Sequence, residues 1–148
     1  MSEYEMVLRL GVAALAGAVL GVDRELRGGS AGIRTNGMVG LSSAAITISA
    51  LLLYESLRAD GGSEMDPLRV IQGLAQAIGF IVAGTIFVSR GSVHNLTSAA
   101  GIWLVAAIGI AAGAGQFTLV ITSVLIGILL LTGVRVVERF IPGSRKAD

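Results

Sequence analysis

Five long stretches of apolar, almost uncharged residues constrain this chain more than any other feature of its sequence. They run Met6–Val22, Gly37–Leu57, Leu68–Ser89, Leu96–Gly113 and Phe117–Val137. A helix needs roughly 20 apolar residues to cross the hydrocarbon of a bilayer, where it satisfies its own backbone hydrogen bonds. Only 14% of the 148 residues are charged, against about 25% in a soluble domain. The sequence therefore predicts an all-α fold, a polytopic membrane bundle of five transmembrane helices.

The composition excludes several kinds of chemistry. The chain has no cysteine and one histidine, and its net charge is +1. It therefore has no disulfide, no thiol nucleophile and no basic surface for nucleic acid. With one histidine and no cysteine it also lacks an evident nucleophile–base pair, so an enzyme is not expected, and no cofactor is expected either. The lipid bilayer is its expected surroundings, and any metal it binds is unknown.

The distribution of basic residues predicts how the helices are oriented. Most of the 11 Lys and Arg residues fall in the first and third loops and in the C-terminal tail. Basic loops stay on the cytoplasmic side. The N-terminus is therefore expected outside and the C-terminus inside, with a single transmembrane domain over residues 1–141 and a short cytoplasmic tail over 142–148.

Three helix starts are visible in the sequence. Asp66-Pro67 is typical of an N-cap followed by proline at the first helical position. Asn36 and Asn95 are expected to cap the second and fourth helices.

The first four helices contain an internal repeat. Without gaps, Val7–Ile48 matches Arg69–Ile110, and a Gly-Ser pair followed five residues later by threonine recurs in both loops. Both hairpins would cross the membrane in the same direction. The sequence thus predicts a parallel duplicated hairpin, with its pseudo-twofold axis along the membrane normal.

Polar residues form two stripes at helical spacing. Ser43 and Thr47 share a face of the second helix, and Gln72 and Gln76 share a face of the third. These residues are predicted to line the bundle interior, where they would form hydrogen bonds between helices or, if the stripes face each other, a polar pathway. Small-residue faces such as Gly109 and Gly113 favour close helix contact, and a homodimer is expected.

The first loop carries the most informative charges. Asp23, Arg24 and Glu25 end the first helix, and Arg34 opens the second. Helix N-termini favour anions. We expect Arg34 and the starts of the second and fourth helices to form an anion-binding pocket, closed in this chain by Asp23 or Glu25. The alternative is an ordinary positively charged loop with turn glycines.

Several ordered motifs resemble the MgtC/SapB (YhiD-like) family over nearly the whole chain. They are Gly21-Val22-Asp23-Arg24-Glu25, Ala31-Gly32-Ile33-Arg34-Thr35, Asp66-Pro67-Leu68-Arg69, Ile78-Gly79-Phe80, Ala83-Gly84, and Leu96-Thr97-Ser98-Ala99-Ala100 with Trp103. The resemblance implies a bacterial inner (plasma) membrane protein linked to magnesium limitation, acid tolerance and virulence. It further implies partners among membrane proteins, including a magnesium-importing P-type ATPase and the ATP synthase. The functional motif residues are expected to be Asp23, Arg24, Glu25, Gly32, Arg34, Thr35, Asp66, Arg69, Thr97 and Ser98.

The chain departs from the family pattern in a few places. Asp23 stands where the family commonly has glutamate, Ala77 and Val82 replace two glycines, and Gly73 replaces a glutamine. The resemblance covers the transmembrane domain, without the ACT-like soluble C-terminal domain of better-known members.

Two functions remain open at this point. The first is a non-enzymatic regulator that binds other membrane proteins, which fits the scarcity of buried ligands. The second is a small dimeric transporter or channel for Mg²⁺ or another small solute, which fits the repeat and the polar stripes.

Overall fold

The computed structural model describes residues 1–59, 66, 68–89 and 92–138, except for the side chains of 135–138. Its elements are α1 (Glu3–Leu26), α2 (Ile33–Ala59), α3 (Leu68–Thr85), β1 (Phe87–Ser89), β2 (Ser92–His94), α4 (Leu96–Gly113) and α5 (Phe117–Glu138). All five of these helices are long and apolar enough to cross a membrane. The predicted all-α bundle of five transmembrane helices is thus confirmed. The expected tail, 142–148, lies outside the described residues.

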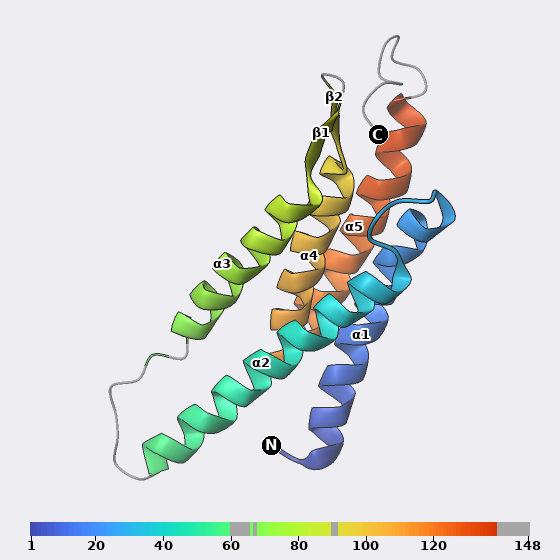
Figure 1. Ribbon diagram of the computed structural model, residues 1–148. Helices are drawn as coiled ribbons and strands as arrows, with labels where there is room; N and C mark the ends of the chain where they lie inside the picture. The colour runs from blue at the N-terminus through green and yellow to red at the C-terminus, as the bar shows by residue number, and fades with distance from the viewer. Residues whose placement is uncertain (60–65, 67, 90–91, 139–148) are drawn as a thin grey trace.

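The helices form a tight centre with two looser neighbours (Figure 1). Helices α1, α2 and α4 pack against one another, α3 packs mainly on α4, and α5 packs on α4 and α1. The α1–α2 turn, the β1–β2 hairpin and the last turns of α5 lie at one end of the bundle (Figure 1). The start of α1, the end of α2 and the start of α3 lie at the other end.

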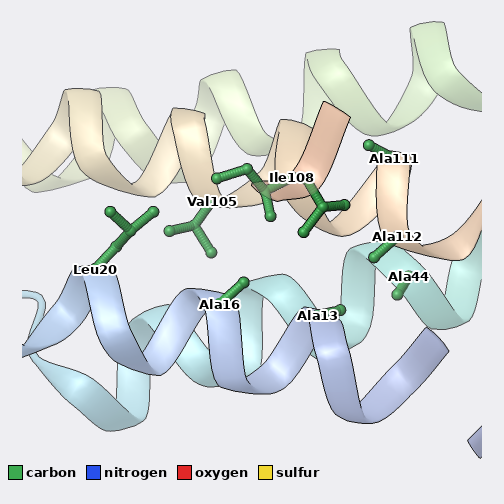
Figure 2. Packing of buried hydrophobic residues seen from close by; sticks show 9 residues of the cluster. Ala13, Ala16, Leu20, Ala44, Val105, Ile108, Ala111 and Ala112 are labelled. Atoms are coloured by element: carbon green, nitrogen blue, oxygen red, sulfur yellow. The ribbon is translucent and has the colours of Figure 1, made fainter. Parts of the chain in front are cut away.

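Small residues allow the central helices to approach closely. Ala13 and Ala16 of α1 and Ala44 of α2 face Val105 and Ile108 of α4 (Figure 2). Since lipid is as apolar as leucine, association of membrane helices depends on such close packing. The core therefore combines small residues on α1 and α2, which let the backbones approach, with branched side chains on α4.

Glycines mark the points of closest approach. A Cβ at Gly40 would lie 2.5 Å from the carbonyl oxygen of Ala13, and one at Gly109 would lie 2.5 Å from that of Gly40. A Cβ at Gly113 would lie 2.7 Å from the carbonyl oxygen of Ala44. The Gly109 and Gly113 face is thus covered by α2 within one chain and is not available to a second copy.

The third helix is shorter than expected, because its last predicted residues form a strand. Helix α3 ends at Thr85, and Phe87–Ser89 pairs antiparallel with Ser92–His94, with Phe87 opposite His94. The rings of these two residues stack with centroids 5.0 Å apart. The prediction of a helix through Ser89 is wrong there, because β-branched and aromatic residues suit a strand once a pairing partner follows closely.

The predicted helix starts have different outcomes. The Asp66 carboxylate accepts a hydrogen bond from the backbone N–H of Leu68 at 2.9 Å, as an N-cap does, while Pro67 lies outside the described residues. Asn36 is not a cap, because α2 already begins at Ile33. Asn95 does occupy the N-cap position of α4, but in the left-handed conformation and without a side-chain capping bond. Its amide donates instead to the carbonyl of Thr85 at 3.0 Å.

The predicted repeat stays a prediction. Helices α1 and α3 run in the same direction (Figure 1), as a parallel duplication requires. Gly91, which the alignment pairs with Gly29, lies outside the described residues.

Candidate functional site at the α1–α2 turn

Helix α1 ends in a turn that two glycines make possible. Gly28 has a φ of 68°, in the left-handed region that glycine enters without strain. Its N–H donates to the Glu25 carbonyl at 3.2 Å, and the N–H of Gly29 donates to the Arg24 carbonyl at 2.8 Å. This paired arrangement is the Schellman motif, which satisfies the last carbonyls of a helix. The chain is thereby turned back towards α2.

Glu25 reaches across this turn to the start of α2. Its Oε2 accepts a hydrogen bond from the backbone N–H of Ile33 at 3.1 Å. A Cβ at Gly32 would overlap that carboxylate, so the glycine makes room for the contact. Of the two carboxylates expected to close the predicted pocket, Glu25 is therefore the one at the N-terminus of α2, where a negative charge is favoured.

Asp23 pairs with two arginines. Its Oδ1 accepts from Arg27 Nε at 2.7 Å, and its Oδ2 accepts from Arg24 Nη2 at 3.1 Å. Arg27 is exposed, whereas the side chains of Asp23 and Arg24 are mostly shielded. One carboxylate thus faces two guanidinium groups, so this cluster carries a net positive charge.

Arg24 is the buried cation at this end of the bundle among the residues that the structure describes. It is 7% exposed, and its Nε has no hydrogen-bond partner among the described residues. A Cβ at Gly29 would lie 3.3 Å from Arg24 Cδ, so the stem of Arg24 packs beneath the turn. Arg34 and Thr35 are exposed. The side chain of Arg34 thus points outward from the first turn of α2, and the prediction that it helps to form an anion-binding pocket stays a prediction.

Asn36 is a member of the site whose role was not predicted. It is 3% exposed, and its Nδ2 donates to the carbonyls of Ala31 and Gly32 at 2.7 and 3.0 Å. Its Oδ1 has no partner among the described residues. The sequence signal was an asparagine shortly after the turn, which suggested a helix cap rather than a buried amide.

Two cavities adjoin Arg24 on different sides. The first has a volume of about 430 Å³, lies between α1, α4 and α5, and is lined by Arg24, Asn36, Thr97 and mainly apolar residues. The second, about 390 Å³, is lined by Arg24, Arg27, the two turn glycines, His94, Asn95 and Ser98. The site therefore combines an apolar groove with a polar cavity, and Arg24 lines both.

The structure gathers some of the predicted motif residues and separates others. Thr97 and Ser98 lie in the first turn of α4 and line these cavities, with Ser98 buried. Asp66 and Arg69 are exposed and lie at the opposite end of the bundle, at the start of α3 (Figure 1). They are therefore not part of this site.

The two predicted polar stripes do not face each other. Ser43 and Thr47 are buried, and Thr47 Oγ1 donates to the Ser43 carbonyl at 2.8 Å. Gln72 and Gln76 are exposed, so the prediction that they line the interior is wrong for a single chain. Helix α3 packs through Leu74, Ile78 and their neighbours, and at 3.6 residues per turn the two glutamines fall on the opposite face.

Metal binding has no evident site in the part of the chain that the structure describes. No group of three or more His, Asp or Glu side chains there is placed to hold an ion.

The fold and this site define a small polytopic membrane protein with a cluster of charged residues at the turn between its first two helices. The chain belongs to the MgtC family, whose model matches residues 10–140. It is 35% identical to YhiD of Escherichia coli (strain K12) over 86% of this chain and 59% of that protein. The name of that relative describes it, provisionally, as a magnesium transporter.

Two other relatives support the same assignment. SapB of Bacillus subtilis (strain 168) is 34% identical over 82% of this chain and 53% of its own length. MgtC of Salmonella typhimurium (strain LT2) is 33% identical over 79% of this chain and 47% of its own length. This chain thus spans about half to three-fifths of the relatives named here. No solved structure matches it.

Proposed function

We propose that this protein is a non-enzymatic regulator of other membrane proteins, linked to magnesium homeostasis and to acid or magnesium stress and virulence. The supporting observation is the close packing at the centre of the bundle. Helices α1, α2 and α4 meet backbone to backbone at Gly40 and Gly109. Every ionisable side chain carried by a helix lies within about two turns of that helix's end. A hydrated ion has no polar route through such a centre.

Helix α3 carries the proposed partner surface. The exposed amides of Gln72 and Gln76 lie in a span that is otherwise apolar between Arg69 and Thr85. Amides facing lipid lack hydrogen-bond partners, and polar side chains in membranes pair across helices instead. A helix of another membrane protein would satisfy both glutamines. The family resemblance points to a magnesium-importing P-type ATPase or the ATP synthase as that protein.

Substitution of the glutamine face tests this proposal. In bacteria whose own copy is deleted, the Gln72→Leu, Gln76→Leu double variant should lose the ability to restore growth at low magnesium. The amount of protein in the membrane should stay unchanged, because neither side chain contributes to the core. Ser49→Leu, also a polar-to-apolar change on an exposed helix face, is the matched control and should restore growth. Full function of the double variant would contradict the partner surface.

A transporter is the alternative function, and the exposed glutamines of α3 favour it if two copies of the chain associate through that helix. If two copies met through α3, the four glutamines would line a polar path between the chains. The name of YhiD refers to magnesium transport. Saturable Mg²⁺ uptake into proteoliposomes, abolished by Gln76→Leu, would establish transport and overturn the regulator. Uptake no faster than in empty liposomes, from folded protein, would support the regulator.

The cellular setting belongs to the same proposal. We propose that the protein lies in the bacterial inner membrane, with its N-terminus outside and its C-terminus in the cytoplasm. The α1–α2 turn with Arg24, Arg27 and Arg34 then lies on the cytoplasmic side, as basic loops do.

A homodimer is also proposed, and co-purification of two differently tagged copies tests it.

A further inference from the structure

The groove beside Arg24 has two chemically different parts. Its polar part is formed by Arg24 at the end of α1, Asn36 in the first turn of α2 and Thr97 in the first turn of α4. Its apolar part follows α4 and α5 away from that end, past Leu104 and Leu130. A volume of about 430 Å³ falls within the range of roughly 300–1,000 Å³ typical of ligand pockets. The shape suits a molecule with a polar head and an apolar tail.

Two buried polar atoms belong to residues at the polar part and lack partners among the described residues. Arg24 Nε is a hydrogen-bond donor, and Asn36 Oδ1 is an acceptor. Leaving a buried polar group unpaired is unfavourable, and more so when the group is charged. A ligand that satisfies both must offer an acceptor to the guanidinium and a donor to the amide.

The charges around Arg24 select an anionic head. The facing groups from α1 are Asp23 and Arg27, and Asp23 is already paired with both arginines. From β2 and α4 the polar cavity adds His94, Asn95 and Ser98. Glu25 is directed to the start of α2. A guanidinium with a free N–H binds phosphate oxygens with favourable geometry and charge.

We propose that this groove binds an anionic phospholipid. The phosphate lies at Arg24, a head-group hydroxyl donates to Asn36 Oδ1, and one acyl chain lies along α4 and α5. Phosphatidylglycerol carries the required phosphate and hydroxyls. A tail gains little by leaving the bilayer for an apolar groove, because the two environments are similar. Selectivity therefore comes from the head group. This proposal does not depend on the regulatory function.

Lipid binding to the purified chain in neutral detergent tests the head-group part. Native mass spectrometry should show a preference for phosphatidylglycerol over phosphatidylcholine with the same acyl chains of at least about fivefold. Both lipids carry the phosphate, but choline brings a cation beside Arg24 and Arg27 and offers no donor to Asn36 Oδ1. Arg24→Gln should reduce the preference, because the choline cation then meets one guanidinium fewer. Arg34→Gln, which alters an exposed arginine at the same end of the bundle, should retain it. Absence of the preference in the unaltered chain would overturn the proposal.

The groove itself is tested by filling it. Gly101 lines the groove, and a Cβ there would meet no atom within 4 Å, so Gly101→Leu should fold and exclude the acyl chain. Gly11 is equally open and does not line the groove, so Gly11→Leu is the matched control. Binding of phosphatidylglycerol should fall in the first variant and persist in the second. If Arg24→Gln does not fold, this pair alone decides the outcome.

Soluble anions distinguish a lipid site from a simple phosphate site. Inorganic phosphate and glycerol phosphate at millimolar concentration should not displace phosphatidylglycerol. The phospholipid assignment is wrong if these soluble anions displace phosphatidylglycerol and the Gly101→Leu variant binds the lipid as strongly as the unaltered chain does. The groove would then play no part in binding.

Discussion

The guanidinium of Arg9 donates a hydrogen bond at 2.7 Å to the carbonyl oxygen of Gly113, a residue 104 positions further along the chain. Arg9 also pairs with Glu5 one turn earlier in α1. Gly113 is the last residue of α4, so its carbonyl has no partner within the helix. A cation at this position also interacts favourably with the negative end of the helix dipole.

Arg9→Gln should therefore lower the stability of the bundle. The expected loss is about 1 kcal/mol, from the hydrogen bond and the dipole together. Thermal unfolding in detergent measures it. Arg58→Gln, which alters an exposed arginine in the last turn of α2, should leave the melting temperature within error. Equal melting temperatures for the two variants would show that the Arg9 contact contributes nothing.

Glu25→Ala should loosen the start of α2 without unfolding the protein. The carboxylate accepts the N–H of Ile33, and loss of such a cap typically costs about 1 kcal/mol. Amide hydrogen exchange in the first turn of α2 should then accelerate about fivefold, which is that free energy expressed as a ratio. Glu55→Ala, near the far end of the same helix, serves as the control. Unchanged exchange at Ile33 would argue against the cap.

Gly109→Ala should disrupt the contact between α4 and α2. The added methyl group would lie 2.5 Å from the carbonyl oxygen of Gly40, and overpacking of this kind costs about 1–3 kcal/mol. Gly101→Ala, on the same helix, meets open space and should be neutral or slightly stabilising, since alanine favours a helix more than glycine does. The measurement is the difference in melting temperature between these variants. If both are neutral, the helices do not meet as closely as described.

Ser30 and Ser56 provide a matched pair for testing the orientation. Both are exposed; Ser30 is in the α1–α2 turn, and Ser56 is near the other end of α2. The chain has no cysteine, so each can be replaced singly by cysteine. A membrane-impermeant maleimide applied to intact cells should label Ser56→Cys and spare Ser30→Cys. Permeabilised cells should be labelled at both, and the reverse pattern in intact cells would place the N-terminus inside.

The spans were predictable because hydropathy is a local property. Leu96–Gly113 was predicted with the bounds that the structure shows, since an apolar run that follows Asn95 and ends at a glycine is visible without tertiary information. The end of α3 at Thr85 and the β1–β2 hairpin after it were not predictable in this way, because a short apolar run can form either a helix or a strand. The choice depended on pairing between Phe87 and His94.

The candidate site was predictable only in part. Either Asp23 or Glu25 was expected to close a pocket at the helix starts, because a helix N-terminus favours an anion, and the structure places Glu25 there. The burial of Arg24 and the exposure of Arg34 depended on how α1 and α2 rotate against each other. Gly17 sets that rotation, since a Cβ there would overlap the backbone of Asn36.

By itself, the sequence determined that this chain is a five-helix membrane protein of its family, because apolar length and ordered motifs are read along the chain. Only the tertiary structure decided which polar residues are buried. It placed Arg24 inside and turned Gln76 outward. The physical reason is that the rotation of each helix about its axis depends on where small residues let two backbones come into contact. Those contacts are between residues far apart in the sequence.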